Sequence, residues 1–324
     1  MSPQLRPLDS AAVVQAASVI RAHLPPTPLR RCFALRPREV YLKLECWQPT
    51  GSFKVRGAIN VLSGLTAEER ERGIVAASAG NHALGIAFAA DAAGRGVAVR
   101  VYVPSTAPRA KVDKLRAFPV EVVEGGATYD DAYDAAEEDV ARTGATLVHA
   151  YDDPRTAAGQ GTVAVEVRDA LPDVGTVIAP CGGGGLVAAM AVYLKAEMPD
   201  VRIVAVQTEA SPSLRESLRR GTPLHEYAYE PTVADGIAGG IGDLVFAHRA
   251  LIDEVIDVSE ADIEAAIGAL LAEDQVVAEG AGAVPVAAVM SGRVVARDGR
   301  PMVAVVTGGN VDPAILARAL ARRR

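Results

Sequence analysis

The amino-acid sequence predicts a two-lobed α/β protein whose parallel sheets are covered by helices. Short apolar runs alternate with longer stretches of helical period along most of the chain, which is typical of β-α-β units. Half of the 324 residues are hydrophobic and 23% are charged, so the chain can bury a large core and is not mainly disordered. A chain of this length usually forms two domains, or one large unit with an inserted lobe.

The first half of the chain is expected to begin with an amphipathic helix over residues 8–22, capped by Asp9 or Ser10. The prolines at positions 25, 26 and 28 then force an extended exit. The strands expected next cover residues 40–44, 74–77, 97–103, 120–123 and 146–149. Helices should follow the last four strands, over residues 82–93, 108–118, 129–142 and 156–171.

The second half repeats this alternation. Strands are expected over residues 176–179, 202–206 and 302–306, and helices over 186–197, near Leu214 and from Pro313. The Gly-rich span 222–242 has no clear period, and long irregular loops in compact domains are usually functional. We expect residues 71–149 to form the smaller lobe, inserted in a larger lobe made of residues 1–70 and 150–324.

Charge and cysteine content exclude several classes of protein. The net charge is −7, so there is no basic field to attract nucleic acid or an anionic membrane surface. Cys32, Cys46 and Cys181 are an odd number without CxxC spacing, which supports neither a disulfide framework nor a zinc site. The N-terminus lacks the pattern of a signal peptide, and no apolar run is long enough to span a membrane. We therefore expect a cytoplasmic protein without a nucleic-acid or membrane partner.

A lysine in an unusual place is the first candidate for chemistry. Lys54 follows a Pro/Gly turn in Gln48-Pro-Thr-Gly-Ser-Phe-Lys-Val-Arg-Gly-Ala58 and opens an expected helix. The positive end of a helix dipole disfavours an ammonium group, and the apolar neighbours Phe53 and Val55 lower the pKa of the amine further. Such an amine suits a nucleophile or a Schiff-base carrier. Taken alone, the pattern also fits a solvated lysine in a turn.

Between an expected strand and an expected helix lies Ala77-Ser-Ala-Gly-Asn-His82. Backbone N–H groups converge at such a helix start, and this geometry can hold an anion such as a carboxylate. A plain turn capped by Asn81 fits the same residues. His82 alone indicates a local hydrogen-bonding role and not a catalyst or a metal ligand.

A second turn of this kind carries four adjacent glycines, in Pro180-Cys-Gly-Gly-Gly-Gly-Leu186. Adjacent glycines are costly in chain entropy unless the backbone must approach something closely, and a phosphate is the leading candidate. Gly183, Gly185 and Ala188 also satisfy G-x-G-x-x-A, with Glu209 beyond the next strand, so a dinucleotide-binding fold is a competing interpretation. The last such segment, Val306-Thr-Gly-Gly-Asn310, is a weak signal by itself.

Taken in order, these motifs and Glu279-Gly-Ala-Gly-Ala283 resemble the serine/threonine dehydratase group of pyridoxal 5'-phosphate (PLP) enzymes. That group has the tryptophan-synthase-β type of fold, also called fold type II. The resemblance covers nearly the whole chain, and it weakens the dinucleotide interpretation, which gives Lys54 no role. It implies a large lobe that binds the cofactor and a small lobe that binds the substrate.

The resemblance also implies a role for individual residues. Lys54 would be the catalytic residue and would carry the cofactor as a Schiff base, with Phe53 against the ring. The residues implied in cofactor binding are Phe53, Lys54, Asn81, Gly182, Gly183, Gly184, Gly185, Leu186, Gly236, Glu279 and Thr307. The substrate carboxylate would dock on the loop formed by Ser78, Ala79, Gly80, Asn81 and His82. A helix-start carboxylate is the structural alternative for Glu279.

The reaction implied is removal of water and ammonia from a small β-hydroxy amino acid. Thr307 would face the pyridine nitrogen, and a hydroxyl there cannot keep that nitrogen protonated by charge pairing as an aspartate would. The ring is then a weaker electron sink, which favours β-elimination over transamination. Lys54, once displaced by the substrate amine, would remove the Cα proton, and the products would be a 2-oxo acid and ammonia.

Departures from the family pattern narrow the expectation. Serine racemases of this fold use a serine as second acid/base where this chain has Ala79, so racemisation is disfavoured. Arg215 stands where their divalent-ion site needs a carboxylate, which leaves Glu209 a poor metal site. We expect no required divalent ion, while a monovalent cation stays open. The short tail beyond Thr307 argues against an effector-binding domain.

Alternatives remain open on the sequence. L-Threonine and L-serine lead as substrates, ahead of 3-hydroxyaspartate and other β-hydroxy amino acids. A serine racemase, a β-replacing synthase of the same fold, an NAD-dependent oxidoreductase and a non-catalytic binding protein are the competing functions. The family resemblance implies a homodimer or a homotetramer, with no nucleic-acid or membrane partner.

Overall fold

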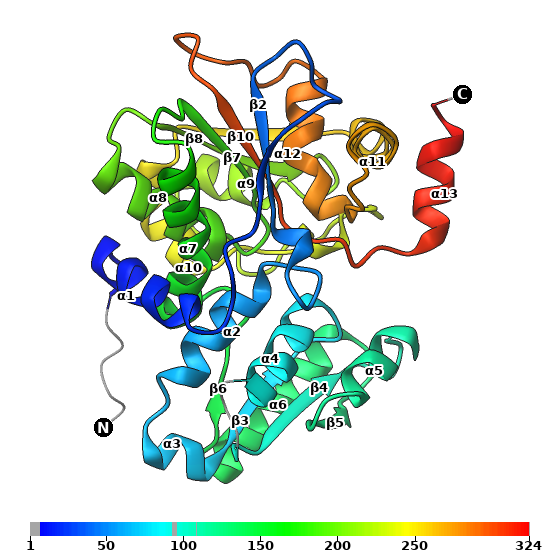
Figure 1. Ribbon diagram of the computed structural model, residues 1–324. Helices are drawn as coiled ribbons and strands as arrows, with labels where there is room; N and C mark the ends of the chain where they lie inside the picture. The colour runs from blue at the N-terminus through cyan, green and yellow to red at the C-terminus, as the bar shows by residue number, and fades with distance from the viewer. Residues whose placement is uncertain (1–6, 93–95, 108, 324) are drawn as a thin grey trace.

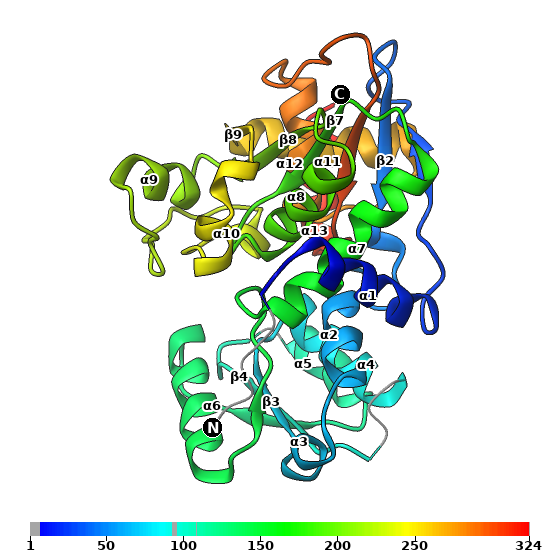
Figure 2. The ribbon, with the colours of Figure 1, turned by 90° about the vertical axis from the view of Figure 1, so that its left-hand side faces the viewer.

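The computed structural model describes residues 7–92, 96–107 and 109–323, and in them the chain builds two sheets in separate halves (Figures 1 and 2). The larger sheet has the strand order β1-β2-β10-β7-β8-β9, and all its pairs are parallel except β1 with β2. Its strands are β1 Leu29–Arg31, β2 Val40–Leu44, β7 Thr176–Pro180, β8 Arg202–Thr208, β9 Glu254–Val258 and β10 Met302–Val306.

The smaller sheet is fully parallel, in the order β5-β4-β3-β6. Its strands are β3 Ile74–Ala77, β4 Val99–Val103, β5 Glu121–Glu124 and β6 Thr146–Leu147. All the expected strands are present, most within two residues of their predicted ends. The strand predicted over 146–149 is shorter, because residues 149–153 turn away and connect the two halves.

Helices cover both faces of each sheet, as the alternation predicted. The helices of the first half are α1 Ser10–Arg21, α2 Lys54–Ser63, α3 Ala67–Arg72, α4 Asn81–Ala92, α5 Arg109–Arg116, α6 Tyr129–Thr143 and α7 Pro154–Ala170. Those of the second half are α8 Gly185–Glu197, α9 Ser213–Arg220, α10 Asp243–Ala247, α11 Glu260–Asp274, α12 Gly280–Met290 and α13 Pro313–Ala321. Residues 93 and 108, at the ends of two predicted helices, lie outside the described residues.

The apolar core follows the period-two alternation of the strands. On the larger sheet, Val177, Ile203 and Val305 face α1, α7 and α8, whereas Ile178 and Val204 face α11 and α12. On the smaller sheet, one face packs against α2 and α4 and the other against α6. No helix in the described part of the chain is long and apolar enough to cross a membrane.

Helix α2 lies between the two halves (Figures 1 and 2). Val55, Ala58 and Ile59 join the apolar cluster of the smaller sheet. On its other side α2 meets α7 so closely that a Cβ on Gly159 would lie 2.7 Å from Gly57 Cα. The lobe boundaries at residues 71 and 149 therefore stay a proposal, since α2 lies outside them and still contributes to the small core.

A buried ionic network also fixes α2. The Arg56 guanidinium is fully buried and contacts Glu45 at 2.7 Å and Glu166 at 2.7 Å, and Lys43 binds the same Glu166 carboxylate. Buried ion pairs contribute little net stability but strongly penalise any arrangement that separates them. This network therefore ties the start of α2 to β2 and α7.

We expect Gly159→Ala to lower the free energy of unfolding by about 1–3 kcal/mol, because the new methyl group would overlap Gly57, the Arg56 carbonyl and Asn60. Gly64→Ala, at the end of the facing helix α2, is the control, since its Cβ would lie at an ordinary 3.4 Å from the Asn60 carbonyl. Urea unfolding of both variants measures the difference. Equal midpoints would show that the α2–α7 contact can relax.

Candidate active site

The carboxyl end of β10 holds the loop that carries Lys54. Ser52 forms an isolated antiparallel bridge with Gly308, and the Phe53 N–H donates to the Thr307 carbonyl at 3.0 Å. The Gly309 N–H donates to the Gly51 carbonyl at 2.9 Å. Because β10 is an interior strand of the larger sheet, these bonds hold the first residue of α2 at the end of the sheet where its parallel strands have their carboxyl ends.

Lys54 begins α2 and its amine is not in bulk solvent. Nζ donates to the Ala150 carbonyl at 2.9 Å and lies 5.2 Å from the centre of the Phe53 ring. Burial lowers the pKa of Lys54 to about 8, and the nearby Glu279 carboxylate opposes this shift. Part of the amine is therefore uncharged near neutral pH. The sequence predicted a lowered pKa, which is the direction found.

The tetraglycine turn packs against Tyr151, the residue that follows the Ala150 acceptor of that amine. A Cβ on Gly183 would lie 2.3 Å from the Tyr151 ring, and one on Gly185 would lie 2.3 Å from the Tyr151 carbonyl. Gly184 has a φ of +87°, which an L side chain rarely adopts. Tight packing on protein atoms is therefore one reason for glycine here, in addition to the approach of a phosphate that the sequence suggested.

The amides of this turn are available for a ligand. Among the described residues, none of the N–H groups of Gly182 to Leu186 donates a hydrogen bond to a protein acceptor. They stand at the N-terminus of α8, where the helix dipole favours an anion. Cys181, before the turn, is fully buried and its thiol pKa is raised to about 12 by burial, so it is no nucleophile at neutral pH.

The loop of Ser78 to His82 opens α4 beside the start of α2. A Cβ on Gly85, one turn into α4, would lie 3.0 Å from the Lys54 carbonyl carbon. The Gly80 N–H donates to Ser78 Oγ at 3.0 Å, whereas the amides of Ala79, Asn81 and His82 donate to no acceptor in the described residues. These amides can bind a carboxylate.

The His82 side chain points into the protein. It is buried, and its Nε2 donates to the Val148 carbonyl at 2.8 Å. Burial lowers the pKa of His82 to about 3, and the nearby Lys54 charge acts in the same direction. The His82 imidazole is therefore neutral, and its side chain makes a local hydrogen bond inside the protein.

Glu279 and Asn81 form a hydrogen-bonded pair with Asn310. The Asn81 amide donates to Glu279 Oε1 at 2.7 Å and accepts from Asn310 Nδ2 at 2.8 Å. Glu279 occupies the N-cap position of α12, so it does stand at a helix start, but its side chain makes no cap bond and instead accepts from Asn81. Burial raises the pKa of Glu279 to about 7, with a further contribution from Asp235.

Thr307 and Gly236, the last two residues that the sequence suggested, lie near the same end of the larger sheet. Thr307 follows β10 and is buried. Gly236 lies in a short 3-10 helix, Asp235–Ile237, and its Cβ would meet the Ala281 Cβ of α12 at 3.2 Å. Ile237 of that helix packs on the tetraglycine turn, where a Cβ on Gly182 would lie 2.8 Å from the Ile237 Cα. The irregular span 222–242 therefore reaches the site.

Sequence reasoning missed residues 149–153. This segment carries the carbonyl that binds Lys54, the ring that covers Gly183, and the Asp152 carboxylate that accepts from the amides of Asp243 and Leu244 at the start of α10. Asp153 caps α7. The cap and Pro154 could have marked the helix start, but no sequence signal connects Ala150 with Lys54. The sequence gives Asn310 no role beyond being the last residue of the motif that begins at Val306.

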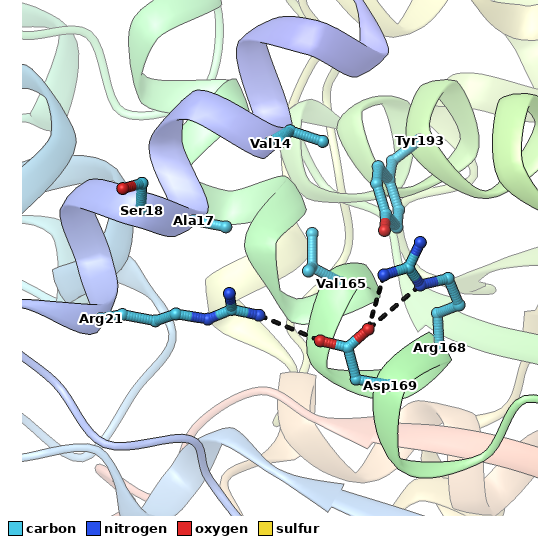
Figure 3. A pocket seen from close by; sticks show the side chains of 8 residues that line it. All are labelled: Val14, Ala17, Ser18, Arg21, Val165, Arg168, Asp169 and Tyr193. Atoms are coloured by element: carbon cyan, nitrogen blue, oxygen red, sulfur yellow. Dashed lines mark hydrogen bonds and ion pairs between the residues drawn. The ribbon is translucent and has the colours of Figure 1, made fainter.

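A cavity of about 410 Å³ lies away from these residues, between α1, α7 and α8 (Figure 3). It is lined by Val14, Ala17, Ser18, Arg21, Val165, Arg168, Asp169 and Tyr193. Asp169 pairs with both Arg21 and Arg168, so neither cation is left for a ligand. None of the residues gathered around Lys54 lines it.

Comparison with known proteins identifies the family of this chain. Residues 20–308 match the family model described as "Pyridoxal-phosphate dependent enzyme". The chain is 45% identical to an L-threonine ammonia-lyase of Thermotoga maritima over 282 residues, covering 86% of this chain and 69% of that protein. It is 39% identical to a catabolic L-threonine dehydratase of Staphylococcus aureus, over 93% of this chain and 88% of the other. The structure of maize serine racemase superposes with a TM-score of 0.88 at 29% identity, covering 98% of each chain.

The fold and the site thus define a PLP-dependent enzyme of fold type II, the class of tryptophan synthase β. Within this class the chain belongs to the serine/threonine dehydratase family, also called the threonine ammonia-lyases. The expected fold class, cofactor dependence and lyase type are confirmed by these matches.

The raised pKa of Glu279 predicts a pH-dependent stability. A carboxyl whose pKa rises from 4.5 to about 7 on folding stabilises the protein below pH 4.5, and this contribution is lost as the pH rises through 7. Relative to Glu279→Gln, the cofactor-free wild type should lose on the order of 2–3 kcal/mol of unfolding free energy between pH 5 and pH 8. Urea titrations at both pH values measure this difference.

Glu226→Gln, at an exposed site, is the control for this pH dependence. A pH-independent difference between wild type and Glu279→Gln would contradict the expectation.

Proposed function

We propose that the protein converts L-threonine, L-serine or a related β-hydroxy amino acid to a 2-oxo acid and ammonia by α,β-elimination. The observation that carries this is the Lys54 amine, partly neutral and bound to the Ala150 carbonyl, near two turns in which several amides donate to no acceptor among the described residues. The named activities of the Thermotoga and Staphylococcus relatives support the substrate class.

The residues present fit PLP. The open amides of Gly182 to Leu186 suit the phosphate, and the depressed pKa of Lys54 suits a covalent link to an aldehyde. When bound, the cofactor supplies an aldehyde that captures amines and a ring that withdraws electrons from Cα. The other residues proposed to contact it are Phe53, Asn81, Gly236, Glu279 and Thr307.

Lys54 is the proposed base. With a pKa of about 8, an appreciable fraction of the free amine carries no proton near neutral pH, so it can accept one from Cα. The hydrogen bond to Ala150 restricts where the nitrogen can lie, which reduces the entropy cost of the proton transfer. The amides of Ala79, Asn81 and His82 would hold the substrate carboxylate and so orient Cα.

Thr307 supports elimination over other PLP chemistry. It follows β10 and carries a hydroxyl and not a carboxylate, so it supplies no negative charge to keep a ring nitrogen protonated. Electrons released at Cα are then better taken by a leaving group at Cβ. Transamination, which needs the ring to store them, is disfavoured.

Serine racemisation is the second candidate, because the maize serine racemase shares the fold over 98% of each chain. Racemisation needs a proton donor on the face opposite Lys54. Ala79, in the loop at the start of α4, offers only a methyl group that packs against the apolar cluster of the smaller sheet. A β-replacing synthase would need a second, nucleophilic substrate.

No divalent cation is required in this proposal. Arg293 binds the Glu209 carboxylate at 2.9 Å, and Arg215 pairs with Asp257. A monovalent cation is compatible with the fold. We further propose a cytoplasmic homodimer or homotetramer that has no nucleic-acid or membrane partner.

We expect Lys54→Ala to abolish the release of keto acid and to remove the visible absorbance of the bound cofactor. Lys114→Ala, in an exposed position on α5, should keep both and is the matched control. Absorbance spectra and a coupled keto-acid assay provide the two measurements. Full activity in Lys54→Ala would refute the assignment of the base.

Across a panel of β-hydroxy amino acids, L-threonine and L-serine should release keto acid fastest. An acidic or aromatic member with a higher kcat/KM would overturn this ranking. Chiral analysis of remaining serine should show less racemised product than keto acid, and Ala79→Ser should increase the racemised fraction. More racemised product than keto acid in the wild type would overturn the role given to Ala79.

A further inference from the structure

The turn of residues 149–153 depends on one side chain. His149 Nδ1 accepts hydrogen bonds from two backbone amides, Tyr151 N–H at 3.3 Å and Asp152 N–H at 2.8 Å. Ala150 lies inside the turn that these bonds close, and its carbonyl is the acceptor for Lys54 Nζ. An Nδ1 that accepts cannot carry a proton, so the turn requires a neutral imidazole with its hydrogen on Nε2.

The surroundings of His149 favour that neutral form. The ring is half-buried and lies edge-on to Tyr151, with ring centres 4.5 Å apart, and to Tyr133 of α6 at 5.9 Å. Burial lowers the pKa of His149, and so does the charge of Lys54 on α2. Asp152 and Asp153 act in the opposite direction. His82 of α4 also faces it and is itself neutral.

The same turn is joined to the rest of the site. The Tyr151 ring covers Gly183, and Asp152 caps α10, which follows Gly242. The Gly242 N–H in turn donates to the Gly183 carbonyl at 3.0 Å. If the two bonds to His149 were lost, Ala150 would no longer be held in place, and the amine would lose its acceptor.

We propose that His149 is a positioning residue for Lys54: the neutral imidazole closes the turn that presents the Ala150 carbonyl to the amine. This inference rests on the proposed role of Lys54. Protonation of Nδ1 removes the acceptor of both amides and releases the turn. His149 therefore acts on the reaction without contacting the reacting atoms.

Three substitutions test the proposal. In His149→Asn the amide oxygen can take the place of Nδ1, and it does not titrate. In His149→Gln the oxygen lies near the position of Nε2 instead. His149→Leu has no acceptor. At pH 8, Asn should keep kcat within about threefold of wild type, whereas Gln and Leu should lose roughly 10- to 100-fold in kcat with KM little changed. Equal kcat values for Asn and Gln would overturn the proposal.

The pH profile gives a second readout. Wild-type kcat should show an additional fall below pH 6.5, the ordinary pKa of histidine, that His149→Asn lacks. The titrations of Lys54 and Glu279 are common to both proteins and cancel in the comparison. Identical acid limbs in wild type and His149→Asn would overturn the proposal.

A third measurement does not depend on turnover. In cofactor-free protein, the rate at which added PLP develops its visible absorbance reports on the placement of the Lys54 amine. The absorbance should develop fast in wild type and in His149→Asn, and slowly in His149→Gln and His149→Leu. If no variant releases keto acid but this order holds, the proposed reaction is wrong and the positioning role stands. Equal rates in all four proteins would overturn the role of His149.

Discussion

The bonds between the end of β10 and residues 51–53 are the constraint on which the site depends. They are backbone interactions, so they fix the position of Lys54 without relying on any particular side chain. Gly308 and Gly309 are needed because a Cβ on Gly308 would lie 2.1 Å from Glu279 Oε1 and one on Gly309 would lie 2.7 Å from the Val277 carbonyl. Close packing at this strand end thus brings Lys54, Glu279 and Asn81 together.

Charge is distributed unevenly around that constraint. Open amides in two turns offer positive partial charge at the starts of α4 and α8. The Glu279 carboxylate contributes negative charge, which raises the pKa of the Lys54 amine. Burial drives the pKa of Lys54 down and that of Glu279 up, so both groups approach neutrality. A buried amine and a buried acid with converging pKa values are typical of a site that moves protons.

Much of this could be predicted from the sequence, for physical reasons that differ between elements. Lys54, the tetraglycine turn and the loop of residues 78–82 all stand between a strand and a helix or at a helix start, so their backbone geometry follows from local pattern. Helix α12 was not predicted because it is buried on all sides and carries Pro285, which removes the amphipathic period. Helix α11 was not predicted either, although the capping box of Ser259 and Asp262 gives it a readable start.

The interactions of residues 149–153 and Asn310 arise only in the folded chain, between segments far apart in sequence. Even the four glycines have a second explanation that the sequence does not contain, because backbone and side-chain atoms of Tyr151, Val245 and Ile237 occupy the space that a Cβ would need.

The placement of α2 has a mechanical consequence. Gly159 of α7 lies against one side of this helix and Gly85 of α4 against another, and neither contact has a side chain that could rotate to absorb a displacement. A rigid-body rotation of the smaller half would therefore have to carry α2 with it or separate one of these glycine contacts.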